Sequence, residues 1–166
     1  RLSPWDSRAP APHLDAGDSQ QLMTFEEAVE LIQGAFTEID KSMGEFVQKM
    51  AKDGWIEGTI SSKKRPGAYC TSFSKSRTPR VYMTYSGSTS DVITLAHELG
   101  HALHFWVMRD LPECQRRYGM SLAETASTLG ETAVRNALLE KSIGNAEKLN
   151  IMWEELSAFT TFTLNI

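Results

Sequence analysis

The apolar positions of the first third of the chain recur at helical spacing, after an irregular lead-in over residues 1–21. Thr24 and Glu27 form a capping box, in which the two side chains satisfy free backbone N–H groups at the start of a helix. Apolar residues then repeat every three or four positions, at Phe25, Val29, Ile32, Phe36, Ile39, Met43, Phe46, Val47 and Met50. Asp53 and Gly54 are typical of a helix end. The pattern predicts one helix near residues 24–52.

Residues 54–87 have a different pattern, in which short β-forming runs alternate with turn residues. Residues 69–73 and 81–85 are rich in β-branched and aromatic side chains, and the polar stretch between them indicates a turn. A small antiparallel sheet or hairpin is expected. The strand near 81–87 is either an ordinary sheet edge or an edge to which a peptide could add as a further strand. In the second case the candidate substrate-binding residues are Tyr85, Ser86 and Gly87.

Helical spacing returns in the second half of the chain. Ser88 and Asp91 form a second capping box, which predicts a helix over about 90–109. Further helices are expected over about 121–140 and 145–160. Together these elements predict a mainly α chain with a small antiparallel β-sheet or hairpin, organised as a single partial domain over residues 1–166.

Composition narrows the class of protein. The 166 residues are 41% hydrophobic and 23% charged, which is ordinary for a globular domain, and the net charge of −4 gives no basic surface for nucleic acid. No apolar run is long enough to span a bilayer and no signal peptide is visible. Cys70 and Cys114 form neither a metal motif nor a disulfide framework, so a cytoplasmic location is expected. The start at Arg1 and the apolar end suggest a piece of a longer protein.

The chemistry of the chain concentrates at His97-Glu98-Leu99-Gly100-His101, within the helix expected over 90–109. His97 and His101 lie one turn apart on the same helix face, a spacing at which two imidazoles can bind one zinc ion. Glu98 then lies near the open coordination position. So short a pattern also arises by chance on solvated helices. Here the flanking residues are apolar, and burying two histidines and a glutamate is costly unless they have a partner such as zinc.

A catalytic zinc site needs a third protein ligand. His104 shares the face of His97, but it lies two turns away, about 10 Å along the axis, so it is better interpreted as a supporting or core-packed histidine. Glu124 fits a His₂Glu ligand set, although an acid there could simply favour the helix N-terminus. Glu131 either orients a ligand imidazole or pairs with Arg135 at i+4.

Several segments together carry a family resemblance. Residues 94–104 read TLAHELGHALH and residues 121–128 read SLAETAST. These two motifs resemble the oligoendopeptidase F branch of the thimet oligopeptidase-like (M3) zinc peptidases. Residues 64–70, residues 80–85 and the Trp5-Asp6 pair are also similar to that family, so the resemblance covers most of the chain.

The resemblance implies a zincin-like, largely helical catalytic core with one Zn²⁺ held by His97, His101 and Glu124. It implies a zinc metalloendopeptidase that hydrolyses oligopeptides through a zinc-activated water, with Glu98 as the general base. No nucleic-acid or membrane partner is expected, and the oligomeric state is not indicated. Family members have a large N-terminal region and a later segment with substrate-binding His and Tyr residues. This chain is therefore expected to bind zinc but to cleave peptides poorly. The alternative is a non-catalytic zinc-binding fragment that binds a peptide or a partner chain.

Overall fold

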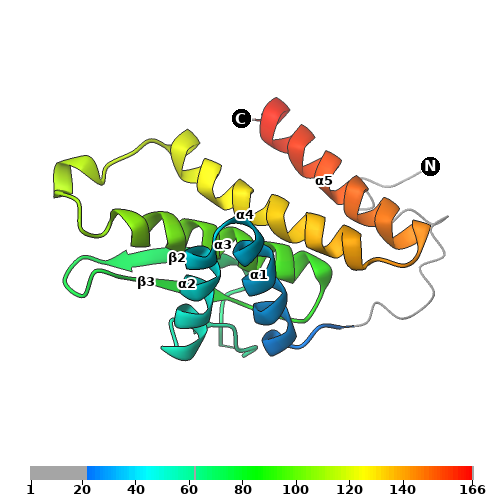
Figure 1. Ribbon diagram of the computed structural model, residues 1–166, viewed down its shortest axis with the longest axis horizontal. Helices are drawn as coiled ribbons and strands as arrows, with labels where there is room; N and C mark the ends of the chain where they lie inside the picture. Colours follow the sequence, from blue (N-terminus) through cyan, green and yellow to red (C-terminus); the bar gives the residue numbers. More distant parts are fainter. Residues whose placement is uncertain (1–21, 62, 166) are drawn as a thin grey trace. The chain divides into compact units, whose positions relative to one another are not determined.

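The computed structural model describes residues 22–61 and 63–165, with side chains up to residue 160 (Figure 1). The irregular lead-in expected over residues 1–21 lies outside this part of the chain. Described residues up to Glu140 form one compact unit, and those from Lys141 onward belong to a second. The single domain expected from the sequence stays a prediction. None of the helices in the described ranges combines the length and the apolar character that a membrane crossing requires.

The first unit begins with two helices, α1 over Phe25–Ile39 and α2 over Lys41–Lys52. The capping box of Thr24 and Glu27 is confirmed. The single helix expected near 24–52 is wrong, because Asp40 adopts an extended conformation (φ −157°, ψ 135°). Its carboxylate accepts a hydrogen bond from the Ser42 backbone N–H (2.8 Å) and so caps α2. The apolar spacing continues across the break because both helices bury one face in the same core.

A three-stranded mixed sheet follows, with β1 at Ile56–Glu57, β2 at Ala68–Phe73 and β3 at Thr78–Met83. The strand order is β1-β3-β2. The expected hairpin is confirmed, since β2 and β3 pair antiparallel with Cys70 opposite Val81. The sheet as a whole is mixed, because the additional strand β1 pairs parallel to β3. β3 is therefore the central strand, and the edge expected near residues 81–87 belongs instead to β2.

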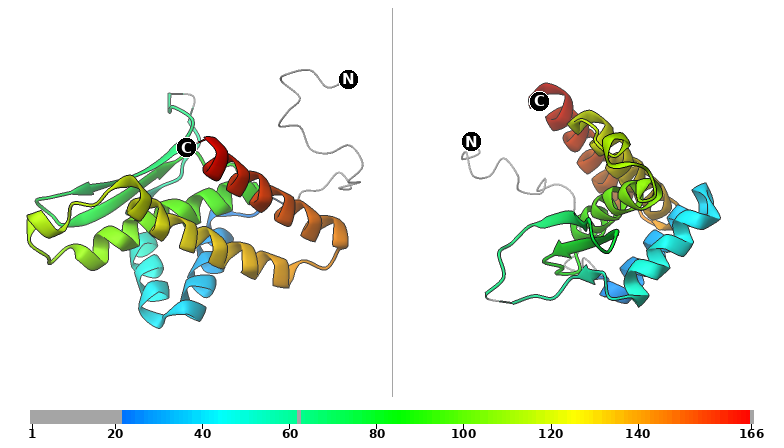
Figure 2. Two further views of the ribbon diagram at one scale, coloured as in Figure 1. Left: turned by 90° about the horizontal axis from the view of Figure 1, so that it is seen from above. Right: turned by 90° about the vertical axis from the view of Figure 1, so that its left-hand side faces the viewer.

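The central helix of the unit is α3, over Thr89–Met108, and its expected capping box of Ser88 and Asp91 is confirmed. It passes over one face of the sheet and also contacts α1 and α2 (Figure 2). The largest fully buried apolar side chains come from all of these elements: Ile32, Phe36, Met50, Val81, Met83, Leu95 and Leu99. The helix that carries the histidine motif is thus fixed by the main core.

Two glycines let the next helix, α4 over Met120–Lys141, cross α3 at close range. A Cβ atom on Gly100 of α3 would lie 2.5 Å from the Ala126 carbonyl oxygen of α4, and a Cβ on Gly130 would lie 2.7 Å from the Ala96 carbonyl oxygen of α3. A short 3₁₀ helix, Glu113–Gln115, lies in the connection between them. The second unit contains α5, over Asn145–Asn165, which is longer than the expected 145–160.

We expect Gly100→Ala to lower the free energy of unfolding by about 1–3 kcal/mol, because the added methyl would force α3 and α4 apart. Gly34→Ala is the matched control. A Cβ on Gly34 of α1 meets nothing within 4 Å, and alanine is favoured over glycine in a helix by about 0.5–1 kcal/mol. Urea unfolding of both variants measures the difference. Equal stabilities for Gly100→Ala and the unmodified chain would contradict the close crossing.

A second expectation concerns the Asp91 carboxylate, which accepts hydrogen bonds from the Ser86 N–H (2.9 Å), the Ser86 hydroxyl and the Ser88 N–H (3.2 Å). Burial acts to raise the pKa of Asp91, but these hydrogen bonds outweigh it and lower the pKa. Since the folded pKa lies below the unfolded one, the cap stabilises the fold above the unfolded pKa of about 3.9. That stability is lost as the pH falls through the folded pKa.

Asp91→Asn is expected to lower the free energy of unfolding by about 1 kcal/mol at neutral pH. It should also reduce the loss of stability on acidification, because the titrating group is gone. Urea unfolding from neutral pH to about pH 3 measures both effects. Parallel stability curves for the variant and the unmodified chain would contradict a stabilising role for the ionised carboxylate.

Candidate metal centre

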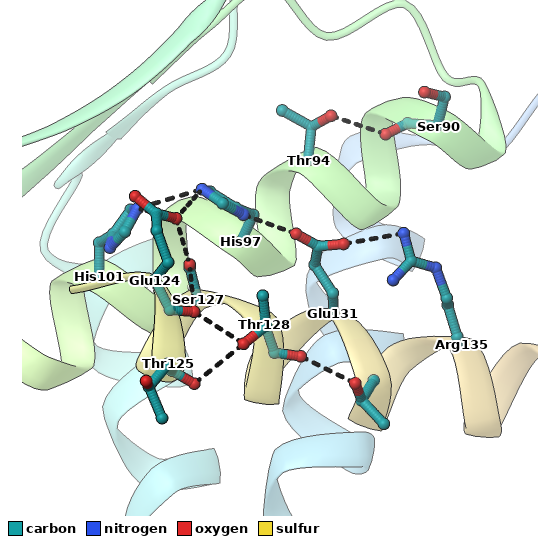
Figure 3. Close-up of polar contacts among 11 residues, drawn as sticks. Ser90, Thr94, His97, His101, Glu124, Thr125, Ser127, Thr128, Glu131 and Arg135 are labelled. Atoms are coloured by element: carbon teal, nitrogen blue, oxygen red, sulfur yellow. Dashed lines mark hydrogen bonds and ion pairs between the residues drawn. The ribbon is translucent and has the colours of Figure 1, made fainter. Parts of the chain in front are cut away.

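Three side chains from α3 and α4 converge on one point (Figure 3). The Nε2 atoms of His97 and His101 lie 3.0 Å apart. An Oε2 atom of Glu124 lies 3.4 Å from the first nitrogen and 3.6 Å from the second. In a tetrahedral zinc site with metal–ligand distances near 2.0–2.1 Å, two ligand atoms are about 3.3–3.4 Å apart. The three observed separations lie around this value, so the residues fit a zinc ion.

The sequence produces this convergence through the helix crossing. His97 and His101 flank Gly100, where the backbone of α4 comes close to α3. Glu124 lies on α4 two residues before Ala126, whose carbonyl oxygen faces Gly100. The close approach therefore brings a carboxylate of one helix within reach of two imidazoles of the other.

Ser127 holds the Glu124 carboxylate in place. Its side chain is fully buried, and its hydroxyl donates to Glu124 Oε2 (2.8 Å). The donated hydrogen bond limits the rotation of the carboxylate, and it reaches the same oxygen, Oε2, that lies nearest the two imidazoles. Sequence reasoning missed this residue. The only available signal was a serine three positions after an acid in a helix, where the two side chains share a face.

Glu131 meets both expectations for it at once. Its Oε1 atom lies 2.6 Å from His97 Nδ1, and its Oε2 atom lies 2.8 Å from an Nη2 nitrogen of Arg135 (Figure 3). A carboxylate at this distance accepts the Nδ1 proton of the imidazole. The Nε2 lone pair of His97 is then directed to the point shared with His101 and Glu124, which is the tautomer a metal ligand requires.

The electrostatics of the site differ between the two histidines. Burial acts to lower the pKa of His97, but the hydrogen bond and charge of Glu131 outweigh it and raise the pKa. Burial, together with the charge of His97, lowers the pKa of His101. Burial also acts to raise the pKa of Glu131, and its contacts with His97 and Arg135 bring that pKa below the usual value. One imidazole is thus paired with a carboxylate, whereas burial disfavours the charged form of the other.

Glu98 lies beside the ligands and faces the sheet. Its side chain is only 6% exposed, and burial raises the pKa of its carboxyl group. The backbone N–H of Cys70 in β2 forms a hydrogen bond with the carboxylate and opposes that shift. Burial raises the pKa of the Cys70 thiol to about 12, which disfavours the thiolate that a nucleophilic cysteine needs.

The outward direction of the Cys70 N–H follows from the pairing of the sheet. Val81, which lies opposite Cys70, donates its own N–H to the Trp55 carbonyl on the β1 side (2.9 Å). The Cys70–Val81 pair is therefore a non-hydrogen-bonded pair of the antiparallel ladder. By the alternation of the ladder, the N–H and C=O groups of Ala68, Cys70 and Ser72 point away from β3, toward the open edge of β2.

His104 does not join the ligands. Its ring packs against that of Tyr118, with centroids 4.4 Å apart, and burial lowers its pKa. Its Nδ1 atom is buried without a hydrogen-bond partner. This arrangement matches the core-packed interpretation of the residue.

The three substrate-binding candidates lie at the start of α3, away from the ligands. Tyr85 is 8% exposed and its hydroxyl donates to the Met23 carbonyl (2.9 Å). Ser86 donates to Asp91, and the Gly87 carbonyl accepts from the Met23 N–H (2.9 Å). At Gly87 the backbone has φ 97°, which favours glycine. All three residues thus fix the entry to α1 and α3, and the structure does not bring them to the metal centre.

Comparison with known proteins identifies the family of the chain. The sequence profile of peptidase family M3 matches residues 2–164. The chain belongs to peptidase family M3. It is 24% identical over 143 residues to oligopeptidase PepF of Bacillus subtilis (strain 168), covering 86% of this chain and 21% of the relative. It is 27% identical over 136 residues to the chromosomal oligoendopeptidase F of Lactococcus lactis subsp. cremoris, covering 81% of this chain and 22% of the relative.

Solved structures show the same fold. A crystal structure of a candidate peptidase from Chlamydophila abortus superimposes with a TM-score of 0.78 and 31% identity, covering 85% of this chain and 24% of the other. A structure of PZ peptidase A with an inhibitor has a TM-score of 0.69 at 22% identity, with 81% and 24% of the two chains covered. The M3 chain described here therefore spans only about a fifth to a quarter of the length of the proteins it matches.

We expect Glu131→Gln to weaken zinc binding by about 10- to 100-fold, because the amide does not hold His97 in the same tautomer with the same strength. Glu38→Gln, at an exposed position of α1, removes the same charge away from the site and serves as the control. Competition with a zinc-sensitive dye measures both affinities. If the two variants bound zinc equally well, Glu131 would have no part in orienting the ligand.

Proposed function

We propose that this chain is the metal-binding core of a zinc endopeptidase that hydrolyses peptide bonds in oligopeptides. The observation that supports the proposal is the combination of a His₂Glu ligand set with a buried carboxylate, Glu98, beside it. His97, His101 and Glu124 would hold one Zn²⁺. Bound there, zinc would polarise the peptide carbonyl and activate a water molecule.

Glu98 would act as the general base. Burial raises its pKa, which brings the carboxyl group closer to the pH at which it both accepts and returns a proton. It would take a proton from the attacking water and then donate it to the leaving amine. The Cys70 N–H keeps the carboxylate on the side of the ligands that faces β2.

The open edge of β2 offers a place for the substrate backbone. The outward N–H and C=O groups at Ala68, Cys70 and Ser72 alternate along the strand in the pattern that an added strand needs. A peptide paired with this edge would run past Glu98. This assignment replaces the strand near residues 81–87, where the backbone is already bonded on both sides: Thr84 donates to the Gly67 carbonyl and Tyr85 to the Gly58 carbonyl.

Two substitutions test the proposed roles. We expect Glu98→Gln to keep bound zinc and to lower the rate of peptide cleavage by about 100-fold or more, because the amide cannot accept a proton. His97→Ala is expected to lose both zinc and cleavage. Zinc content by atomic emission and cleavage of a quenched fluorescent oligopeptide, with and without a chelator, measure these outcomes. Cleavage that survives the chelator would contradict the proposal.

The same assay separates the proposal from its alternative, a zinc-binding fragment without catalysis. That alternative is favoured if zinc is bound stoichiometrically and no chelator-sensitive cleavage appears. The chain spans a small part of its relatives, so a rate below that of the longer proteins is expected. The cytoplasmic location, and the expected lack of nucleic-acid and membrane partners, stay predictions.

A further inference from the structure

A pocket of about 470 Å³ lies at the end of β2, beyond the metal centre. Ser72 of β2 lines it on one side, and Phe105 and Met108 of α3 on another. The connection between α3 and α4 closes it with Arg116, Arg117 and Tyr118. None of the residues assigned above to the metal or to proton transfer lines this pocket.

The pocket carries an unused hydrogen-bond donor on a cation. The Arg116 side chain is only 17% exposed, and its Nη2 group donates to the Glu113 carboxylate. Its Nε atom is buried without any hydrogen-bond partner. Glu113 is 67% exposed, so water screens its charge, whereas the guanidinium is largely desolvated. A buried donor without a partner is costly, so the guanidinium of Arg116 is only partly satisfied by Glu113.

The charges of the pocket favour an anion. Two arginines and one glutamate line it, which leaves one net positive charge. A guanidinium binds a carboxylate through paired N–H groups, and these are among the stronger hydrogen bonds in proteins. Phe105, Met108 and Tyr118 supply apolar surface for the carbon atoms that carry such a group.

The position of the pocket links it to the edge of β2. Ser72 follows Cys70 by two residues on the same face, a separation of about 7 Å along a strand. Phe105 follows His101 by one helical turn, about 5 Å along α3. A peptide that pairs with the β2 edge beside Glu98 would therefore reach the pocket about two or three residues from the scissile bond.

We propose that this pocket is a subsite for a carboxylate of the bound peptide, held by Arg116 and Arg117. The inference rests on the proposed function only in taking the ligand to be a peptide. The carboxylate comes either from an Asp or Glu side chain two or three residues from the scissile bond or from the free carboxyl terminus of a short peptide. Both sources present the same group to the two arginines.

Binding to the 166-residue chain tests the subsite without any need for cleavage. Four fluorescent peptides of one length are compared by anisotropy on zinc-loaded Glu98→Gln protein: a neutral peptide with a free carboxyl terminus, its amide, and amides with Glu or Gln near the centre. The two pairs distinguish the source of the carboxylate, and a further Glu and Gln pair with the substitution on the other side of the centre identifies the direction of the bound peptide. We expect a carboxylate-bearing peptide to bind about 10-fold or more tightly than its uncharged partner.

Substitutions in the pocket should remove that preference. Arg116→Gln and, separately, the exposed Arg117→Gln are expected to reduce the difference between charged and uncharged peptides by several-fold, while zinc content stays unchanged. Lys52→Gln on α2 is the matched control for charge, and it should keep the full preference. If Arg116→Gln disturbed folding, Arg117→Gln alone would still carry the test.

The outcomes separate this subsite from the proposed function. A carboxylate preference that depends on the arginines, together with no chelator-sensitive cleavage by the unmodified chain, supports the subsite and rejects the peptidase activity. Chelator-sensitive cleavage with no such preference supports the activity and rejects the subsite. Equal affinities for all four peptides, or no measurable binding of the carboxylate-bearing ones, overturn the subsite.

Discussion

The close crossing of α3 and α4 is the constraint on which the rest of the site depends. At Gly100 and Gly130 each helix presents hydrogen instead of a side chain to a backbone carbonyl of the other. A metal centre with ligands from two helices needs their axes close enough for short side chains to meet, and glycine permits this approach. Gly100 is also part of the histidine motif itself, so the residues that bind and the residue that allows the approach lie within one turn.

Further contacts orient the side chains that the helix crossing brings together. Arg135 forms an ion pair with Glu131, Glu131 forms a hydrogen bond with His97, and the Ser127 hydroxyl donates a hydrogen bond to Glu124. Each of these partners lies on α4 at a spacing of three or four residues from the next: 124, 127, 131 and 135. One face of a single helix therefore supplies a candidate ligand together with the groups that orient two candidate ligands.

Local sequence patterns were sufficient to predict the features that depend on interactions between residues close in sequence. The two capping boxes, the β2–β3 hairpin and the helices that carry His97 and Glu124 follow from spacing and propensity alone. The break at Asp40 was missed because the spacing of apolar residues does not reveal a change in helix direction when both helices face the same core. The parallel pairing of β1 was missed because this strand has only two residues, too few to show a strand pattern in the sequence. The role of the β2 edge was missed because strand order is a tertiary property.

Glu131 marks the limit of such reasoning. Spacing offered two partners for it, and a carboxylate has two oxygens, so both pairings form at once. His104 was set aside as a ligand because of its axial distance to His97, whereas Tyr85, Ser86 and Gly87 were chosen for their closeness in sequence to the histidine helix. In three dimensions these residues fix loops at the far end of that helix. Residues at the metal end come instead from β2 and from the α3–α4 connection.

The bond from the Val81 N–H to the Trp55 carbonyl has a consequence for how this fold can change its length. It fixes which alternate residues of β3 face β1 and which face β2, and thereby which residues of β2 keep their backbone groups free. Adding one residue within β2 would turn the open groups inward and the inner side chains outward. Adding two would restore both. Insertions of even and odd length in this strand should therefore differ sharply in their effect. The effect of insertions within the 58–67 connection before it should not depend on whether their length is even or odd.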